Sequence, residues 1–347
     1  MSRLILRADS SPEIGLGHVY RMVSLAYMLA PHYECIFVTN DPGKLPAGFS
    51  ELQIPVAEVE KFQYKIPAER KESDETPFDL DPFITGDEVV VTDGYWFGPV
   101  YQRRIKDKGC KLVCVDDEAS GKFYADIIIN HAPGVTPANY KTPDYTFFAL
   151  GADYAMLRPL FLRQAALERK RRPVSTALIC FGGSDYLNLT IPSVKAVIGT
   201  GHFSKIFVVT GAGYLNGNEL KAAVSGADSV SLYSNLDEPE LLSLMLRSDL
   251  AVVPASGILF EALAAECLAV SGMYTANQRQ IYEGFIQQNA IFGCGDFSEL
   301  GKDLRRFLTD SDTWQPRKLI DGLSASRIVG LIKKCEAGAN HPTDLIR

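Results

Sequence analysis

Short apolar segments alternate with stretches of helical periodicity along most of this chain. The segments 4–6, 88–92 and 111–115 carry runs of Val, Leu or Ile, which is typical of buried strands. In 19–29, apolar residues recur at helical spacing instead. Strands that alternate with helices predict a doubly wound parallel sheet. Further strands are expected at 34–39, 125–130, 206–210, 250–254 and 269–271, and further helices at 101–108 and 256–265.

The same alternation starts again in the second half. The apolar segment 176–181 is followed by Gly182-Gly183-Ser184-Asp185 and by a helical pattern over 187–198. A chain of 347 residues is also long for one domain. We therefore expect two Rossmann-type domains, 1–160 and 161–347, facing each other across a ligand-binding cleft. The last helices of the second domain could pack back towards the first.

Two charged runs are expected at the surface. Arg169-Lys170-Arg171-Arg172 ends in Pro173, which is typical of an exposed connection and could link the domains. The charged residues of 69–75 predict a solvated loop or helix face.

Net charge, apolar runs and cysteine spacing limit the kinds of molecule that this chain is expected to bind. The net charge of −7 argues against nucleic acid, and no apolar run is long enough to insert into a membrane. No signal peptide is apparent at the N-terminus, and the seven cysteines are scattered. Because Cys110 and Cys114 are too far apart for a CxxC pair, burial is expected rather than metal binding. We expect a cytoplasmic, monomeric enzyme with a small-molecule substrate.

The segment Gly15-Leu16-Gly17-His18-Val19-Tyr20-Arg21 lies between the first strand and the first helix. Its glycines permit close approach of backbone to a ligand, and a helix start offers N–H groups to an anion. His18 falls in the first helical turn, with Arg21 one turn further on the same side. A dinucleotide fingerprint would need a third glycine near Arg21. The segment predicts a site where His18 accepts or donates a proton beside a bound phosphate. The alternative is a tight turn with a surface histidine.

Polar groups follow several first-half strands, where ligand-contacting residues are expected. Asp9 follows the first strand and could orient the His18 imidazole and raise its basicity. Asp93-Gly94-Tyr95 and Asp116-Asp117 end the next two central strands, and Asn130-His131 ends another. No ligand spacing here supports a metal site, since strand-end carboxylates commonly cap helices.

The second half contains two candidate phosphate sites. Gly182-Gly183-Ser184-Asp185 suits a backbone cradle for a diphosphate, although Ser184 or Asp185 alone would explain a capped helix. Ser256-Gly257, with Glu261 further along, could hold the phosphate and ribose of a nucleotide; alternatively, Glu261 is an acid favoured by the helix dipole. Asn277-Gln278 could bond to a base or sugar.

Jointly these segments resemble the family of pseudaminic acid pathway hydrolases, which remove UDP from UDP-2,4-diacetamido-2,4,6-trideoxy-β-L-altropyranose. That family is related to the MurG-type glycosyltransferases, so the resemblance implies their two-domain GT-B fold. Other matching segments are Arg7-Ala8-Asp9, 154–159 and Ala255-Ser256-Gly257. Leu160 stands where the family often has an acidic residue, and Ala255-Ser256-Gly257 replaces a small-Ser-Ser run. These two departures leave the sugar open.

The resemblance implies that His18 is the general base that activates a water molecule at the anomeric carbon. Tyr95 would position the water or sugar, and Asp9 and Arg21 would either orient His18 or lie on the phosphate side. Hydrolysis with inversion would need no metal and no cofactor, because UDP is a good leaving group. The substrate-binding residues implied are Gly17, Arg21, Gly183, Ser184, Asp185, Ser256, Gly257, Glu261, Asn277 and Gln278.

Two alternatives stay open. A GT-B glycosyltransferase would pass the sugar to an acceptor other than water, but the first half lacks the basic, apolar patch expected for a lipid-linked acceptor. A non-catalytic UDP-sugar binding protein would not need His18, Asp9 and Tyr95 together.

Overall fold

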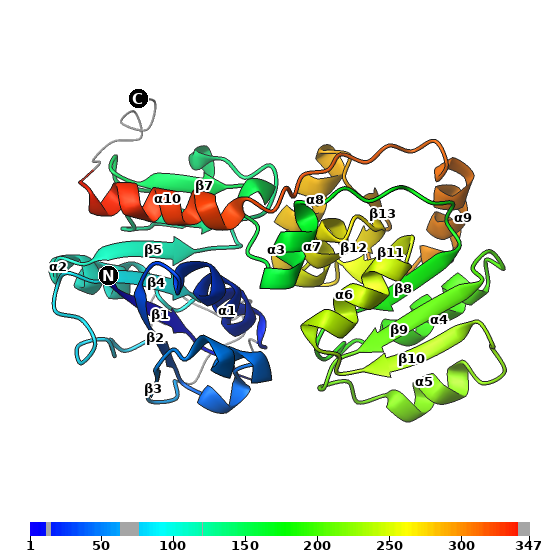
Figure 1. Ribbon diagram of the computed structural model, residues 1–347, viewed down its shortest axis with the longest axis horizontal. Coiled ribbons are helices and arrows are strands. Elements are labelled where there is room, and N and C mark those ends of the chain that lie inside the picture. Colours follow the sequence, from blue (N-terminus) through cyan, green and yellow to red (C-terminus); the bar gives the residue numbers. More distant parts are fainter. Residues whose placement is uncertain (12–14, 63–75, 120, 339–347) are drawn as a thin grey trace. The chain divides into compact units, whose positions relative to one another are not determined.

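The computed structural model describes residues 1–11, 15–62, 76–119 and 121–338; the charged run 69–75 lies outside them. The chain separates into two compact units (Figure 1). The first unit comprises Met1–Pro159 together with the segment from Leu323 onwards, and the second is Leu160–Gly322. No helix within the described ranges is both long enough and apolar enough to cross a membrane.

Within its described residues, the first unit is built on a seven-stranded sheet with the order β3-β2-β1-β4-β5-β6-β7, and neighbouring strands pair in parallel. The strands are β1 (Arg3–Ala8), β2 (Glu34–Thr39), β3 (Val56–Glu58), β4 (Val89–Asp93), β5 (Lys111–Val115), β6 (Ile127–Asn130) and β7 (Phe147–Leu150). The helices are α1 (Gly17–Leu29), α2 (Pro99–Asp107) and α10 (Ser324–Glu336). Strand order reverses between β1 and β4, which is where ligands bind in sheets of this kind.

Strand register determines which side chains meet at the edge of this sheet. Ala8 of β1 lies opposite Asp93 of β4, and Asp93 lies opposite Val115 of β5. Val115 in turn lies opposite Ile129 of β6. The polar residues that end or follow these strands therefore emerge together, beside the start of α1.

The second unit holds a six-stranded parallel sheet among its described residues, in the order β10-β9-β8-β11-β12-β13 (Figure 1). Its strands are β8 (Thr176–Cys180), β9 (Lys205–Thr210), β10 (Val230–Ser234), β11 (Leu250–Pro254), β12 (Leu268–Gly272) and β13 (Phe292–Gly293). Its helices are α3 (Pro159–Ala165), α4 (Thr190–Ile198), α5 (Gly217–Ala223), α6 (Glu238–Arg247), α7 (Gly257–Ala264), α8 (Arg279–Gln287) and α9 (Leu300–Asp310). Apolar side chains of β8, β9, β11, α4 and α9 share one core.

The basic run 169–172 does not link the units, and the linker interpretation is corrected here. Both boundaries lie elsewhere, at Pro159–Leu160 and at Gly322–Leu323. Arg169 Nη2 donates to Ser248 O at 2.6 Å, and Arg172 Nε donates to Asp249 Oδ1 at 3.0 Å. These guanidinium groups fasten the run onto the second unit after the end of α6.

Helix α10 groups with the first unit, at the opposite end of the chain. Ser324 Oγ donates to Ala155 O at 2.7 Å, and Tyr33 Oη donates to Glu336 Oε2 at 2.8 Å. Burial and Glu336 together raise the pKa of the Tyr33 phenol, so Tyr33 remains a donor at neutral pH.

Candidate functional site

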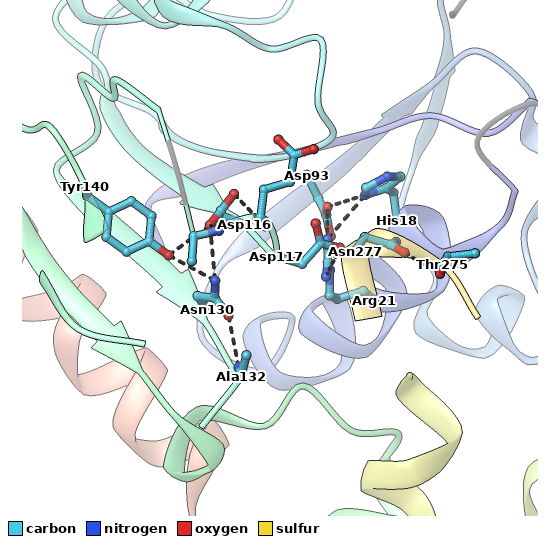
Figure 2. Close-up of polar contacts among 12 residues, drawn as sticks. His18, Arg21, Asp93, Asp116, Asp117, Asn130, Ala132, Tyr140, Thr275 and Asn277 are labelled. Atoms are coloured by element: carbon cyan, nitrogen blue, oxygen red, sulfur yellow. Dashed lines mark hydrogen bonds and ion pairs between the residues drawn. The ribbon is translucent and has the colours of Figure 1, made fainter. Parts of the chain in front are cut away.

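A histidine and two carboxylates converge on one arginine at the carboxyl edge of the first sheet (Figure 2). The first two turns of α1 contribute His18 and Arg21, β4 ends at Asp93, and Asp117 follows β5. Among the residues that the structure describes, which exclude 12–14, no side chain caps the start of α1, and its first turn contains no acidic residue. That helix start therefore leaves backbone N–H groups for an anion.

His18 is in contact with the carboxylate of Asp93. His18 Nδ1 lies 2.7 Å from Asp93 Oδ1, and both side chains are buried. A carboxylate at Nδ1 favours the tautomer that carries its proton there, which leaves Nε2 as the basic nitrogen. The ring of Tyr95 meets the imidazole edge-on, with 4.6 Å between centroids.

Arg21 holds Asp93 from the other side (Figure 2). Its Nε donates to Asp93 Oδ2 and its Nη2 to Asp93 Oδ1, both at 2.6 Å, while Nη1 donates to Asp117 Oδ2 at 2.9 Å. Burial alone would raise the pKa of the Asp93 carboxyl, but Arg21, and then His18, outweigh burial and lower it. Asp93 is therefore an anion at neutral pH, and Arg21 is a positioning group rather than a free phosphate ligand.

A second network fixes the turn that carries Asp117. Asp116 accepts hydrogen bonds from Asn130 Nδ2 at 3.1 Å and from Tyr140 Oη at 2.8 Å (Figure 2). It also accepts from the backbone N–H of Ala119 at 2.8 Å. Burial, and then the charge of Asp117, raise the pKa of Asp116 to about 6.

His131 belongs to the same cluster but differs from His18 in its surroundings. It is buried, and burial followed by the charge of Arg21 lowers its pKa to about 3. It therefore stays neutral throughout the physiological range. Across the described residues, no group of three or more His, Cys, Asp and Glu side chains is arranged to hold a metal ion.

Asp9, expected to orient His18, is engaged elsewhere, and that interpretation is corrected. Its Oδ1 accepts from the Arg7 guanidinium and, at 2.8 Å, from the backbone N–H of Asn40. Arg7 is completely buried and also donates to Asp79 at 2.7 Å. Asp9 thus ties the end of β1 to the segment after β2, and Asp93 takes the orienting position at His18.

The glycine turn after β8 packs against the loop after β9. Gly182 has φ +79°, and the N–H of Gly213 donates to Gly183 O at 3.0 Å. A Cβ on Gly211 would lie 2.3 Å from Gly183 O, so the two loops can approach this closely only with glycine there. Gly183 and Ser184 are exposed at this turn.

Asp185 accepts hydrogen bonds from the start of α4, which is the arrangement expected for a capping residue. Its carboxylate accepts from the backbone N–H groups of Leu189 and Thr190, both at 2.8 Å, and from Thr190 Oγ1 at 2.6 Å. An anion at this helix start would compete with a carboxylate already in place. These contacts agree with the alternative considered from the sequence, a capped helix, and Asp185 as a substrate ligand stays a prediction.

Helix α7 begins without such a cap. Ser256 is its N-cap residue but makes no capping hydrogen bond through its side chain, and Gly257 is exposed. The first turn of α7 contains no acidic residue, so Glu261 is not a first-turn acid. Glu261 is half-buried in the second turn. Of the two helix starts singled out in the second unit, α7 is thus the better anion site.

Asn277 and Gln278, the amide pair expected to contact a base or sugar, differ in their exposure to solvent. Gln278 is buried, and its Oε1 accepts from Tyr274 N at 2.9 Å, so it braces its own loop. Asn277 is exposed, and its Oδ1 accepts from Thr275 Oγ1 at 2.6 Å. Asn277 is the member of the pair that a ligand can reach.

Comparison with known proteins gives distant relatives. No family model matches the chain. It is 27% identical over 298 residues to an uncharacterized protein of Methanocaldococcus jannaschii, covering 82% of this chain but only 58% of the archaeal protein's length. It is 24% identical over 282 residues to the UDP-2,4-diacetamido-2,4,6-trideoxy-beta-L-altropyranose hydrolase of Campylobacter jejuni, covering 80% of this chain and 93% of the hydrolase.

Solved structures show the fold more clearly. MurG of Acinetobacter baumannii matches with a TM-score of 0.59 at 13% identity, over 96% of this chain and 99% of MurG. A UDP-N-acetylglucosamine 2-epimerase matches with a TM-score of 0.60 at 14% identity, over 97% of each chain. The predicted GT-B-like pair of parallel-sheet α/β units is thereby confirmed.

Proposed function

We propose that this protein is an enzyme that hydrolyses a UDP-sugar, with His18 as its general base. The observation that carries the proposal is the 2.7 Å contact between His18 Nδ1 and Asp93 Oδ1, on a carboxylate held at both oxygens by Arg21. Such a buried pair supplies an oriented imidazole that accepts a proton at Nε2. The GT-B-like fold and the distant likeness to the Campylobacter hydrolase support a UDP-sugar as the substrate class.

The proposed substrate is UDP-2,4-diacetamido-2,4,6-trideoxy-β-L-altropyranose. Water attacks the anomeric carbon on the face opposite UDP and forms a new C–O bond. The electron pair of the breaking bond leaves on the diphosphate oxygen, and the water proton passes to His18 Nε2. The imidazolium that results is stabilised by Asp93 through Nδ1. Attack from the opposite face inverts the anomeric configuration. Tyr95, edge-on to the imidazole, is proposed to position the water or the sugar.

In this proposal the second unit holds the nucleotide. Negative charge grows on the diphosphate as the bond breaks, and backbone N–H groups aimed at that charge lower the barrier. The uncapped start of α7 offers such groups at Ser256 and Gly257, and the exposed Gly183-Ser184 turn offers others. Glu261 would accept from the ribose hydroxyls, and Asn277 would contact the nucleotide or sugar edge. The start of α1, at Gly17, where no described side chain forms a cap, is the corresponding anion site in the first unit.

The decisive experiment measures UDP release from a panel of UDP-2,4-diacetamido-trideoxy sugars without added metal, for the wild type and for His18→Gln. We expect release from the altro sugar, free sugar of inverted configuration, and a loss of about a hundredfold or more in the variant. His32→Gln, which changes an exposed histidine of the same unit, should keep full activity. Tight UDP binding without release from any sugar would contradict hydrolysis and point to a transferase with another acceptor.

A further inference from the structure

Of the two carboxylates that Arg21 binds beside His18, the proposed reaction uses Asp93 but not Asp117. Asp117 is nine-tenths buried, and its Oδ2 accepts from Arg21 Nη1 at 2.9 Å. Among the residues that the structure describes, no donor reaches its other oxygen, Oδ1. A buried carboxylate with half of its acceptor capacity unused is costly, so its place beside Arg21 calls for a reason.

The charges around Asp117 come from four elements. Helix α1 brings Arg21 and His18, β4 and the loop after it bring Asp93 and Tyr95, the end of β5 brings Asp116, and the region after β6 brings His131 and Tyr140. His131 is neutral, because its pKa is lowered to about 3. Arg21 is the fixed cation of this set, and it is shared between two anions, Asp93 and Asp117. Such a set carries excess negative charge next to His18.

We propose that Asp117 is a positioning residue that acts through Arg21 on the Asp93–His18 pair. Arg21 is bound at both ends: its Nε and Nη2 face Asp93, while its Nη1 faces Asp117. Two anchors fix the plane of the guanidinium group, and that plane fixes the Asp93 carboxylate against His18 Nδ1. The unused charge of Asp117 also favours the cationic His18 that forms when it takes a proton.

The turn after β5 is built to hold Asp117 in this position. Asp116 accepts from the N–H groups of Glu118 and Ala119, and Ala119 adopts φ +51°. Asn130 and Tyr140 lock Asp116 from a neighbouring strand and its following loop. Asp117 is therefore presented to Arg21 by a turn whose backbone is itself hydrogen-bonded, which suits a group that must not move.

The test compares Asp117→Asn with Glu118→Gln, which removes the same charge one residue further along. Histidine-15N NMR of the full chain, titrated with pH, follows the His18 ring directly, with assignment by His18→Gln. In the wild type we expect the Nδ1-protonated tautomer. In Asp117→Asn the midpoint of the His18 titration should move to lower pH by about half a unit or more, because a nearby negative charge is lost. Glu118→Gln should leave it within about 0.2 units, because solvent screens that half-buried group.

The same variants separate positioning from a structural role. A positioning role moves the acidic limb of the kcat–pH profile to lower pH in Asp117→Asn, whereas a purely structural loss lowers kcat uniformly and leaves the limb in place. An unchanged His18 titration in a folded Asp117→Asn protein would overturn the inference. If that variant does not fold, Arg21→Lys is measured instead. Lysine keeps the positive charge but cannot bind Asp93 and Asp117 at the same time through several N–H groups, so the Nδ1-protonated tautomer of His18 should no longer dominate. The inference rests on the proposed function for the role of His18. Because the NMR titration needs no substrate, the inference can fail while the proposed hydrolysis holds, and the reverse.

Discussion

Arg21 and Asp93 form a two-point ion pair: Nε and Nη2 of the arginine each lie 2.6 Å from a different oxygen of the carboxylate. One of those oxygens, Oδ1, also faces His18 Nδ1. Asp93 therefore receives hydrogen bonds from three N–H groups when His18 carries its proton on Nδ1. Each of those bonds needs an acceptor oxygen at Asp93, so a substitution that replaces one oxygen with a donor must break at least one of them.

Replacing Asp93 with Asn should lower kcat by about 10³ to 10⁴-fold. An amide NH₂ group has to occupy one of the two oxygen positions, and both positions face donors. If the NH₂ group faces Arg21, the arginine is displaced and the group that orients His18 is no longer fixed. If it faces His18, the ring changes tautomer and Nε2 carries the proton instead of accepting one. The measurement is kcat for UDP release with saturating substrate, with a fluorescence titration of UDP as the control for nucleotide binding. A loss of less than tenfold, with UDP binding intact, would show that Asp93 does not orient the base.

Replacing Asp9 with Asn should act on stability instead. Arg7 is completely buried and forms ion pairs with Asp9 and Asp79. Removing one partner of a buried ion pair costs about 3 kcal/mol in the free energy of unfolding. Urea denaturation measures the change. Asp41→Asn, which removes a surface ion pair with Lys61 at 3.5 Å, should stay within about 0.5 kcal/mol of the wild type. The pH profile of the folded Asp9→Asn enzyme should match that of the wild type; a shifted profile would restore Asp9 to a role at His18.

Stability should also depend on pH through Asp116. Its pKa is raised to about 6 in the folded state, first by burial and then by Asp117. Because the folded protein binds this proton more tightly than the unfolded chain, the contribution to stability is present at low pH. It is lost as pH rises from about 4 to about 6, by about 3 kcal/mol in all.

The Asp116→Asn variant removes this titration. Its free energy of unfolding relative to the wild type should therefore rise between pH 4 and pH 6 and become constant above pH 7. Chemical denaturation at several pH values gives that difference directly. The slope is the test, because the amide also changes the hydrogen bonds to Asn130 and Tyr140. A difference independent of pH would contradict the raised pKa.

The sequence predicted the architecture because strands and helices are local patterns. The strands at 111–115 and 250–254 begin and end where β5 and β11 do. The helix expected over 187–198 begins later, at Thr190, because Asp185 caps it from five residues upstream. A carboxylate after two glycines is compatible with both capping and ligand binding, and local sequence does not distinguish them.

The partner of His18 could not be predicted in the same way. His18 and Asp93 are 75 residues apart, and their contact depends on the register of β1 with β4 and on the rotation of α1 about its axis. Asp9 is close to His18 in sequence, but it is taken by Arg7. The contacts of Arg169 could not be predicted for the same reason. A basic run is expected at the surface, and the carbonyl that accepts from Arg169, Ser248 O, is distant in sequence.

The two helix starts of the second unit give a prediction about nucleotide binding. Gly257 has open space where a Cβ would be, so Gly257→Ala should leave the free energy of unfolding within about 0.5 kcal/mol of the wild type. The added methyl group would stand at the uncapped start of α7, where the diphosphate is proposed to bind, and UDP affinity should fall about tenfold. Asp185→Ala should do the reverse: loss of the α4 cap costs about 1 to 2 kcal/mol of stability, while UDP affinity changes less than threefold.

Isothermal titration with UDP and urea denaturation of both variants measure the two effects side by side. The proposal for α7 requires that Gly257→Ala lowers UDP affinity alone and that Asp185→Ala lowers stability alone. A general loss of structure would lower affinity and stability together in each variant. If Asp185→Ala instead weakened UDP binding tenfold without loss of stability, the diphosphate would belong at the turn after β8. Asp185 would then be a ligand-side residue after all, and the start of α7 would be left without a phosphate.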